Sequence, residues 1–127
     1  MQAFIIEPTG RSTATDINID RGVTALQEVV GGWVDVLPLD DDLILWLRDD
    51  HTGQAPNPIA TALVATYTRQ VHLISGTTLI TGTTAGQTIA VTDAQLADLT
   101  RVTNAWRCRH HLLDRITQAT LVKLAWL

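Results

Sequence analysis

The sequence predicts an α+β domain. We expect a small mixed, mostly antiparallel sheet of four to six strands with one short helix packed on it, followed by a C-terminal helical segment. Three observations support this class. Short β-branched and aromatic runs alternate with turn residues up to about residue 91, one helical stretch interrupts them, and neither glycine nor proline occurs from residue 93 onward. The sequence thus predicts a core domain over residues 1–91 and a helical extension over residues 92–127, which packs on the core, on a second subunit, or on both.

The first two strands are predicted by apolar runs at the N-terminus. Residues 3–8 form the first run, and Pro8 ends it because proline cannot donate to a strand ladder. Residues 14–20 alternate between apolar and polar side chains, which predicts a half-buried strand with Ile17 and Ile19 facing inward. We expect the two strands to form a hairpin.

A helix is predicted next. Thr24 and Gln27 have the spacing of a capping box, in which Thr24 is the N-cap. Gly31 and Gly32 end this helix, because glycine enters the left-handed conformation without a Cβ penalty.

A second hairpin follows that helix. Residues 33–38 and 43–47 are rich in β-branched and aromatic side chains, and three consecutive aspartates lie in the turn between them. Because both runs are apolar at nearly every position, we expect both faces of these strands to be covered, with Trp33 and Trp46 in the core.

The middle of the chain predicts one more helix and two more strands. After a polar loop over residues 49–58, the apolar residues 59–67 predict a short helix that begins at Pro58. Residues 71–81 predict a strand, in which Gly76 is a bend or a site of close backbone approach. A turn over residues 82–87 leads to a short strand at residues 89–91.

The C-terminal segment begins with a second capping box at Thr92 and Gln95. As a single helix it would be about 50 Å long at 1.5 Å per residue, longer than such a domain is wide. Either it breaks near residues 107–111 into a helical hairpin, or it projects and pairs with another subunit. We favour a homodimer through these helices, with candidate interface residues Trp106, Leu113, Ile116, Leu124 and Trp126.

Composition limits the cellular setting. The chain has 127 residues, 46% of them hydrophobic and 17% charged, as in a folded domain. The single cysteine, Cys108, excludes an internal disulfide and fits a reducing compartment. The sequence has no signal-peptide pattern and no apolar run that could span a membrane, so we expect a cytoplasmic protein with no membrane contact.

Charge is unevenly distributed along the chain. The net charge is −4, and residues 1–50 contain ten acidic residues but only three arginines. Residues 93–127 contain four arginines and one lysine against three aspartates. A solvated surface explains this pattern, and so does a basic tail that docks on an acidic surface. Phosphate contacts are a less favoured use of the candidate residues Arg101, Arg107, Arg109 and Arg115.

We predict no catalytic site, metal site or cofactor. The aspartates between residues 40 and 50 lack the spacing of a calcium-binding loop. Cys108 and His111 have a spacing that would allow one metal ion, but no further ligand is evident. The sequence also lacks a nucleophile elbow, a phosphate-binding glycine loop and a dinucleotide fingerprint.

The best candidate for a small binding site is Asn57, which lies between two prolines with Thr61 one helical turn further on. Such an asparagine caps the next helix, and it also has an amide that a ligand could use. We favour the cap, and we name Asn57, Thr61 and Gly76 as candidate contacts for a ligand or partner.

An ordered set of short segments resembles a family known only as a numbered domain of unknown function. It comprises residues 6–8, 26–33, 37–39, 57–62 and 73–77 followed by Gly82, and it extends over roughly residues 3–82. The family usually has a Glu-Gly-Lys turn where this chain has residues 50–53. The resemblance implies an accessory protein of phages or mobile elements of Gram-positive bacteria, and it transfers no catalytic residue. Residues 93–127 are expected to lie outside it.

Together these observations predict a non-enzymatic protein that binds, and thereby modulates, a protein of the host or of the element; host defence is one process in which it could act. One alternative is a nucleic-acid-associated regulator that uses the basic C-terminal helix. The other is a protein that binds or sequesters a small ligand.

Overall fold

The computed structural model describes residues 1–50 and 53–109. The strands are β1 (Gln2–Ile6), β2 (Ser12–Asp16), β3 (Val34–Pro38), β4 (Leu43–Arg48), β5 (Thr78–Thr84) and β6 (Gln87–Ile89). The helices are α1 (Val23–Val30), α2 (Pro58–Thr68) and α3 (Asp93–Arg107), with a short 3-10 turn η1 at Ile19–Arg21. The predicted α+β class is confirmed.

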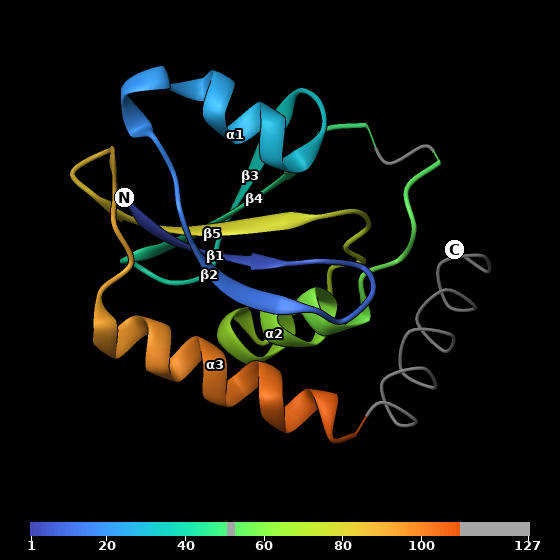
Figure 1. Cartoon of the computed structure of the whole chain (residues 1–127). Helices are drawn as coiled ribbons and strands as arrows, with labels where there is room; N and C mark the ends of the chain where they lie inside the picture. Colours follow the sequence, from blue (N-terminus) through green and yellow to red (C-terminus); the bar gives the residue numbers. More distant parts are fainter. Residues whose placement is uncertain (51–52, 110–127) are drawn as a thin grey trace.

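The six strands form one sheet, in which every pairing is antiparallel. The strand order is β2-β1-β5-β4-β3. Strand β6 is off this path: it pairs with residues 82–84 of β5, whereas β1 pairs with residues 78–80. In Figure 1, α1 lies on one face of the sheet, and α2 and α3 lie on the other. The first strand of the chain is therefore interior to the sheet, between β2 and β5.

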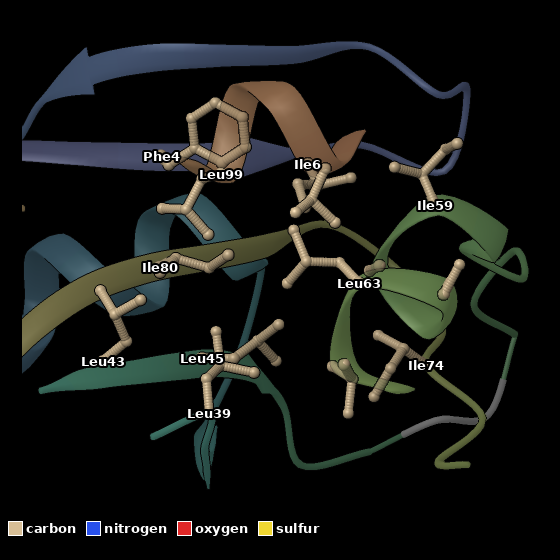
Figure 2. Close-up of a cluster of buried hydrophobic side chains, with 14 of the residues drawn as sticks. Phe4, Ile6, Leu39, Leu43, Leu45, Ile59, Leu63, Ile74, Ile80 and Leu99 are labelled. Atoms are coloured by element: carbon tan, nitrogen blue, oxygen red, sulfur yellow. The ribbon is translucent and has the colours of Figure 1, made fainter. Parts of the chain in front are cut away.

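Two hydrophobic clusters hold these layers together. The larger cluster lies between the sheet and the helices α2 and α3, and it includes Phe4, Leu45, Leu63 and Ile80 (Figure 2). The smaller cluster lies under α1 and includes Ala3, Leu26 and Leu79. Alternate residues of the central strands thus pack in opposite clusters, as the period of a strand requires.

Helix α3 belongs to the larger cluster. Leu99 has no exposed surface and Val102 is 5% exposed, and both pack among the buried residues of the sheet and α2. The predicted capping box is confirmed: Thr92 Oγ1 accepts from the amide of Gln95 at 3.1 Å, and Gln95 Oε1 accepts from that of Thr92 at 2.9 Å. The two alternatives for the C-terminal segment, one long helix or a helical hairpin, concern residues beyond 109 and so lie outside the described residues.

Other helix ends also agree with the sequence. Helix α1 ends at Gly31, whose φ of 86° is left-handed and whose amide donates to the Gln27 carbonyl at 2.8 Å. Helix α2 begins at Pro58 with Asn57 as its N-cap. The capping box predicted at Thr24 is wrong. Helix α1 starts earlier, after Gly22, and no side chain caps it.

The second strand is shorter than predicted. Strand β2 ends at Asp16, and the Asn18 side chain then accepts from the amide of Asp20 at 3.1 Å to start the 3-10 turn. Ile17 is buried, but Ile19 is 38% exposed, so the predicted inward position of Ile19 is wrong. The hydrogen bond from the Asp20 amide to the Asn18 side chain competes with strand pairing at this point, and the strand ends.

The predicted coverage of both faces of the second hairpin is also wrong. Strand β3 is the last strand of the sheet, and three of its five residues are exposed. Trp33 is 77% exposed, although the sequence predicts it in the core. Trp46 is partly buried in the smaller cluster, where its indole N–H donates to Thr81 Oγ1 at 2.8 Å.

The strand predicted over residues 71–81 begins only at Thr78 and continues to Thr84. Gly76 explains the difference, since its φ of +78° turns the chain and a Cβ at this position would overlap Gln54 Oε1. The predicted bend at Gly76 is therefore confirmed, and it separates residues 71–75 from β5. The turn to β6 is at Ala85 and Gly86, which both have positive φ.

Candidate functional site

Asn57 is fully buried, and it connects three parts of the chain. Its Nδ2 donates to the carbonyls of Ile6 at 3.0 Å and Gly76 at 2.9 Å, and its Oδ1 accepts from the amide of Ala60 at 3.1 Å. Its own carbonyl accepts from the Thr61 hydroxyl at 2.9 Å. Both donors of the amide group are therefore bound within the protein.

The three residues predicted as ligand contacts thus lie together. Thr61 is 4% exposed, and its hydroxyl also accepts from the amide of Ile74 at 3.1 Å. This arrangement joins the start of α2 to the end of β1 and to the turn before β5. The cap role predicted for Asn57 is confirmed, while contact with a ligand or partner stays a prediction for Asn57, Thr61 and Gly76.

The candidate interface and phosphate residues are dispersed. Trp106 packs against the larger cluster of its own chain, and its indole N–H donates to Thr66 Oγ1 at 2.9 Å. Arg107 donates to the carbonyl of Gly10 at 2.9 Å and to the hydroxyl of Ser12 at 2.5 Å, which fastens the end of α3 to the β1–β2 turn. The other predicted interface residues, and Arg115, lie outside the described residues: Leu113, Ile116, Leu124 and Trp126.

A surface groove that the sequence does not indicate lies at the other end of α2. One half, about 480 Å³, lies between the β3–β4 turn and α2, and the second half, about 300 Å³, lies between α2 and α3. Asp40 and Tyr67 line both halves. We call this hollow the Tyr67 groove; its remaining lining residues are Pro38, Leu39, Asp41, Thr66, Thr68, Arg69, Asp98, Arg101 and Val102.

A hydrogen-bonded chain of side chains lines the part of the groove between α2 and α3. The Tyr67 hydroxyl donates to Asp98 Oδ2, and the Arg101 guanidinium donates to Asp98 Oδ1 at 2.6 Å. Burial and the neighbouring Asp98 carboxylate raise the pKa of Tyr67, so the phenol stays protonated. The bond from Tyr67, and then the bond from Arg101, lower the pKa of Asp98, so this carboxylate stays ionised.

Replacing Tyr67 with phenylalanine is expected to cost about 1 kcal/mol of unfolding free energy near neutral pH, since Asp98 is half-exposed and the bond is partly screened. A carboxylate with a lowered folded pKa stabilises the fold above its unfolded pKa, and this contribution disappears as the pH falls through the folded pKa. Urea titrations near pH 7 and about pH 3 should therefore show the deficit shrinking in acid. An equal deficit at both pH values would contradict this account.

Arg69 lies at the C-terminal end of α2 in an unusual conformation. Its φ of 58° is left-handed, and its amide donates to the Ala65 carbonyl at 2.8 Å. Glycine is the usual residue at such a helix end, because a Cβ is strained there. Among residues 1–50 and 53–109, Arg69 has no ion-pair partner, so a strained position presents an unpaired cation to the groove.

The β3–β4 turn adds acidic side chains to the lining of the groove. Asp40 and Asp41 are exposed in the β3–β4 turn, which the Asp42 amide closes by donating to Asp40 Oδ1 at 2.8 Å. Within the described part of the chain neither Asp40 nor Asp41 forms an ion pair. The Tyr67 groove is therefore lined by unpaired charges of both signs: Asp40 and Arg69 line the part between α2 and α3, and Asp41 lines the part beside the β3–β4 turn.

Within these residues no three His, Cys, Asp or Glu side chains are grouped so as to hold a metal ion. Cys108 is exposed and free at the end of α3. None of the helices over this part of the chain has the length and apolar character needed to cross a bilayer.

Comparison with curated proteins and with solved structures found no match to this chain. A family model, described as a domain of unknown function, matches residues 1–104. The match includes most of α3, so the expected end of the resemblance before residue 93 is wrong. By this match over most of its length, the chain belongs to the family DUF3846, whose description is "Domain of unknown function".

Proposed function

We propose that the chain is a non-enzymatic binding protein that holds a partner protein in the Tyr67 groove. The observation that carries the proposal is that unpaired charges of both signs line the groove: the Arg69 cation, at a strained helix end, and the carboxylates of Asp40 and Asp41. Strained residues gather at sites where binding or switching requires them.

The chemistry of the groove favours a protein surface over a buried small molecule. Small-ligand sites are concave and mostly apolar, with few polar groups. Here most lining side chains are charged or hydroxyl-bearing, and the groove is open to solvent. A partner that carries both acidic and basic side chains would complement the charges of both signs in the groove.

The protonation states within the groove support a non-enzymatic role. A general acid or base is most effective with a pKa near the working pH. The pKa of Tyr67 is raised and that of Asp98 is lowered, so neither group is suited to exchange protons near neutrality.

The wider role follows from the family resemblance. It is that of an accessory protein of a phage or mobile element, acting in the host cytoplasm and modulating a protein of the host or of the element. A homodimer through the C-terminal helices remains part of the proposal. Because Trp106 packs within its own chain, Leu113, Ile116, Leu124 and Trp126 are left as the contacts of that dimer.

Replacing Arg69 with glycine is expected to raise the unfolding free energy by about 0.5–1 kcal/mol, because glycine relieves the left-handed strain. The same change removes the cation of the groove, so binding of the partner should fall. Denaturation measures the first effect. Capture from a Gram-positive bacterial lysate, read by mass spectrometry, measures the second. If Arg69→Gly is more stable than the wild type but captures less of the partner, the loss of binding cannot be attributed to a loss of folded protein.

Ala85 supplies the matched control, since it is the other non-glycine residue with positive φ among residues 1–50 and 53–109 and lies in the β5–β6 turn. Ala85→Gly should also be more stable but should capture the same partner as the wild type. Retention of that partner by Arg69→Gly combined with Asp41→Asn would refute the groove as the binding site.

The volume of the groove supports small-ligand binding as a second candidate, since about 300 Å³ is at the lower limit for such sites. A thermal-shift screen with nucleotides and amino acids tests it, because a ligand that binds only the folded state raises the melting temperature.

The nucleic-acid alternative is weaker, since Arg101 and Arg107 are already hydrogen-bonded within the chain. This alternative requires that the protein binds DNA or RNA with a steep dependence on salt concentration, and that the double variant Arg107→Ala with Arg109→Ala abolishes this binding.

A further inference from the structure

The outer edge of β3 carries the most exposed large apolar side chain of the described residues. Trp33, immediately before β3, is 77% exposed, and Val36 within the strand is 45% exposed. Within residues 1–50 and 53–109, strand β3 pairs with β4 and with no other strand. We call residues 33–38 together with Asp49 the β3 edge.

The backbone of the β3 edge presents acceptors and few donors. Leu39 donates to the Leu43 carbonyl at 2.9 Å, and Asp49 donates to the Trp33 carbonyl at 2.8 Å, which identifies the hydrogen-bonded pairs of the β3–β4 ladder. The residues between those pairs, Val34, Val36 and Pro38, therefore direct their backbone groups away from β4.

Two of the three outward positions offer no free N–H group. Pro38 has none, and the Val36 amide donates to Asp35 Oδ1 at 2.8 Å. The outward backbone groups are thus three carbonyls and the single amide of Val34. A partner strand needs alternating donors and acceptors on this edge, so addition of a strand is disfavoured.

Carboxylates add further acceptors. Asp35 and Asp49 are exposed, and neither has an ion-pair partner in the part of the chain that the structure describes. Asp49 lies opposite Trp33 in the ladder. The nearby Arg48 instead pairs with Asp50, at 3.7 Å. The surface therefore combines an exposed indole, unpaired negative charge and unused carbonyl groups.

We propose that the β3 edge binds an arginine-bearing segment of a partner protein. A guanidinium group has five donors and no acceptor, which complements an edge made of acceptors. It also stacks on an indole ring, and its planar fork contacts a carboxylate through two N–H groups, whereas a lysine ammonium is a point charge. The inference rests on the proposed function only in that the partner is a protein.

Binding of a fluorescent oligoarginine peptide, followed by anisotropy at physiological salt, tests the proposal against an oligolysine peptide of equal length. We expect the arginine peptide to bind about tenfold more tightly, and Trp33→Ala to weaken it about five- to tenfold. Asp35→Asn with Asp49→Asn should weaken it similarly. Asparagine at position 35 keeps an oxygen that can accept from Val36, so this variant removes charge and leaves the edge geometry in place.

A matched variant distinguishes the edge from the general acidity of the chain. Asp20→Asn with Asp93→Asn removes two exposed carboxylates elsewhere and should change peptide affinity less than about twofold. Equal weakening by this control, equal binding of the two peptides, or unchanged binding by Trp33→Ala would each overturn the proposal. Arg69→Gly should bind oligoarginine as the wild type does, so failure at the groove and failure at the edge are distinguishable.

Discussion

Asn57→Ala is expected to lower the unfolding free energy by about 2–4 kcal/mol, since it removes a helix cap worth about 1 kcal/mol and takes the donor from the buried Gly76 carbonyl at about 1–3 kcal/mol. The Ile6 carbonyl also loses its bond from Asn57 but keeps one from the Thr78 hydroxyl at 3.2 Å. The start of α2 thus loses its Asn57 side-chain links to β1 and to the turn before β5. Urea denaturation measures the effect. A domain with 5–15 kcal/mol of stability would be close to unfolding.

Asn18→Ala is the control for the cap alone. Asn18 is exposed, and its side chain accepts only from the Asp20 amide, so its loss should cost about 0.5–1 kcal/mol. If Asn57→Ala cost no more than Asn18→Ala, the buried connections would contribute nothing.

Asn57→Asp gives a second check, through pH. Aspartate keeps the oxygen that accepts from the Ala60 amide but turns a buried donor into an acceptor facing two carbonyls. Burial should raise the pKa of this carboxyl, and its protonated form can donate to one carbonyl. The variant should therefore be less destabilised at acidic pH than at neutral pH.

Leu99→Ala is expected to lower the unfolding free energy by about 3 kcal/mol. This lies within the range of about 2–5 kcal/mol for replacing a buried leucine with alanine, which removes apolar contacts and leaves a cavity. Leu99 has no exposed surface and packs in the larger cluster between α3, the sheet and α2 (Figure 2). One cooperative transition at a lower urea midpoint would show that α3 unfolds with the sheet.

The partly buried Leu96 provides the comparison, and its replacement with alanine should cost less than that of Leu99. If α3 were an extension independent of residues 1–91, Leu99→Ala would leave the main transition unchanged. The same reasoning bears on truncation. A chain that ends near residue 90 would expose the cluster that Leu99 and Val102 cover, whereas one that ends at residue 109 keeps it.

Local chemistry explains the parts of the fold that the sequence predicts correctly. The N-caps at Asn57 and Thr92 and the helix end at Gly31 depend on partners three or four residues away, so their patterns are complete in a short stretch. Thr24 has the same capping pattern, but helix α1 begins before it, so the pattern alone does not determine the start.

The exposure of β3 could not be predicted, because it depends on strand order. An apolar residue at nearly every position indicates a strand covered on both faces. Strand order instead puts β3 at the end of the sheet, and that order depends on pairings between strands far apart in the chain. Trp33 is therefore on the surface although its sequence context resembles a core strand.

The Tyr67 groove has no sequence signal for a similar reason. Asp40, Tyr67 and Asp98 lie in a turn and two helices that are distant in the chain, and only the packing of the β3–β4 turn, α2 and α3 in the fold brings them together. By contrast, Asn57 was identifiable from its flanking prolines, although its bonds to Ile6 and Gly76 were not.

The interior position of β1 has a consequence for synthesis on the ribosome. Strand β1 ends at Ile6, yet one of its edges pairs with β5, which begins only at Thr78. At about 5–20 residues per second, the nascent hairpin of β1 and β2 waits several seconds with an apolar edge unpaired. That interval is the time when another chain could pair with it. Slow translation before residue 78 should therefore increase aggregation of the newborn protein more than slow translation after it.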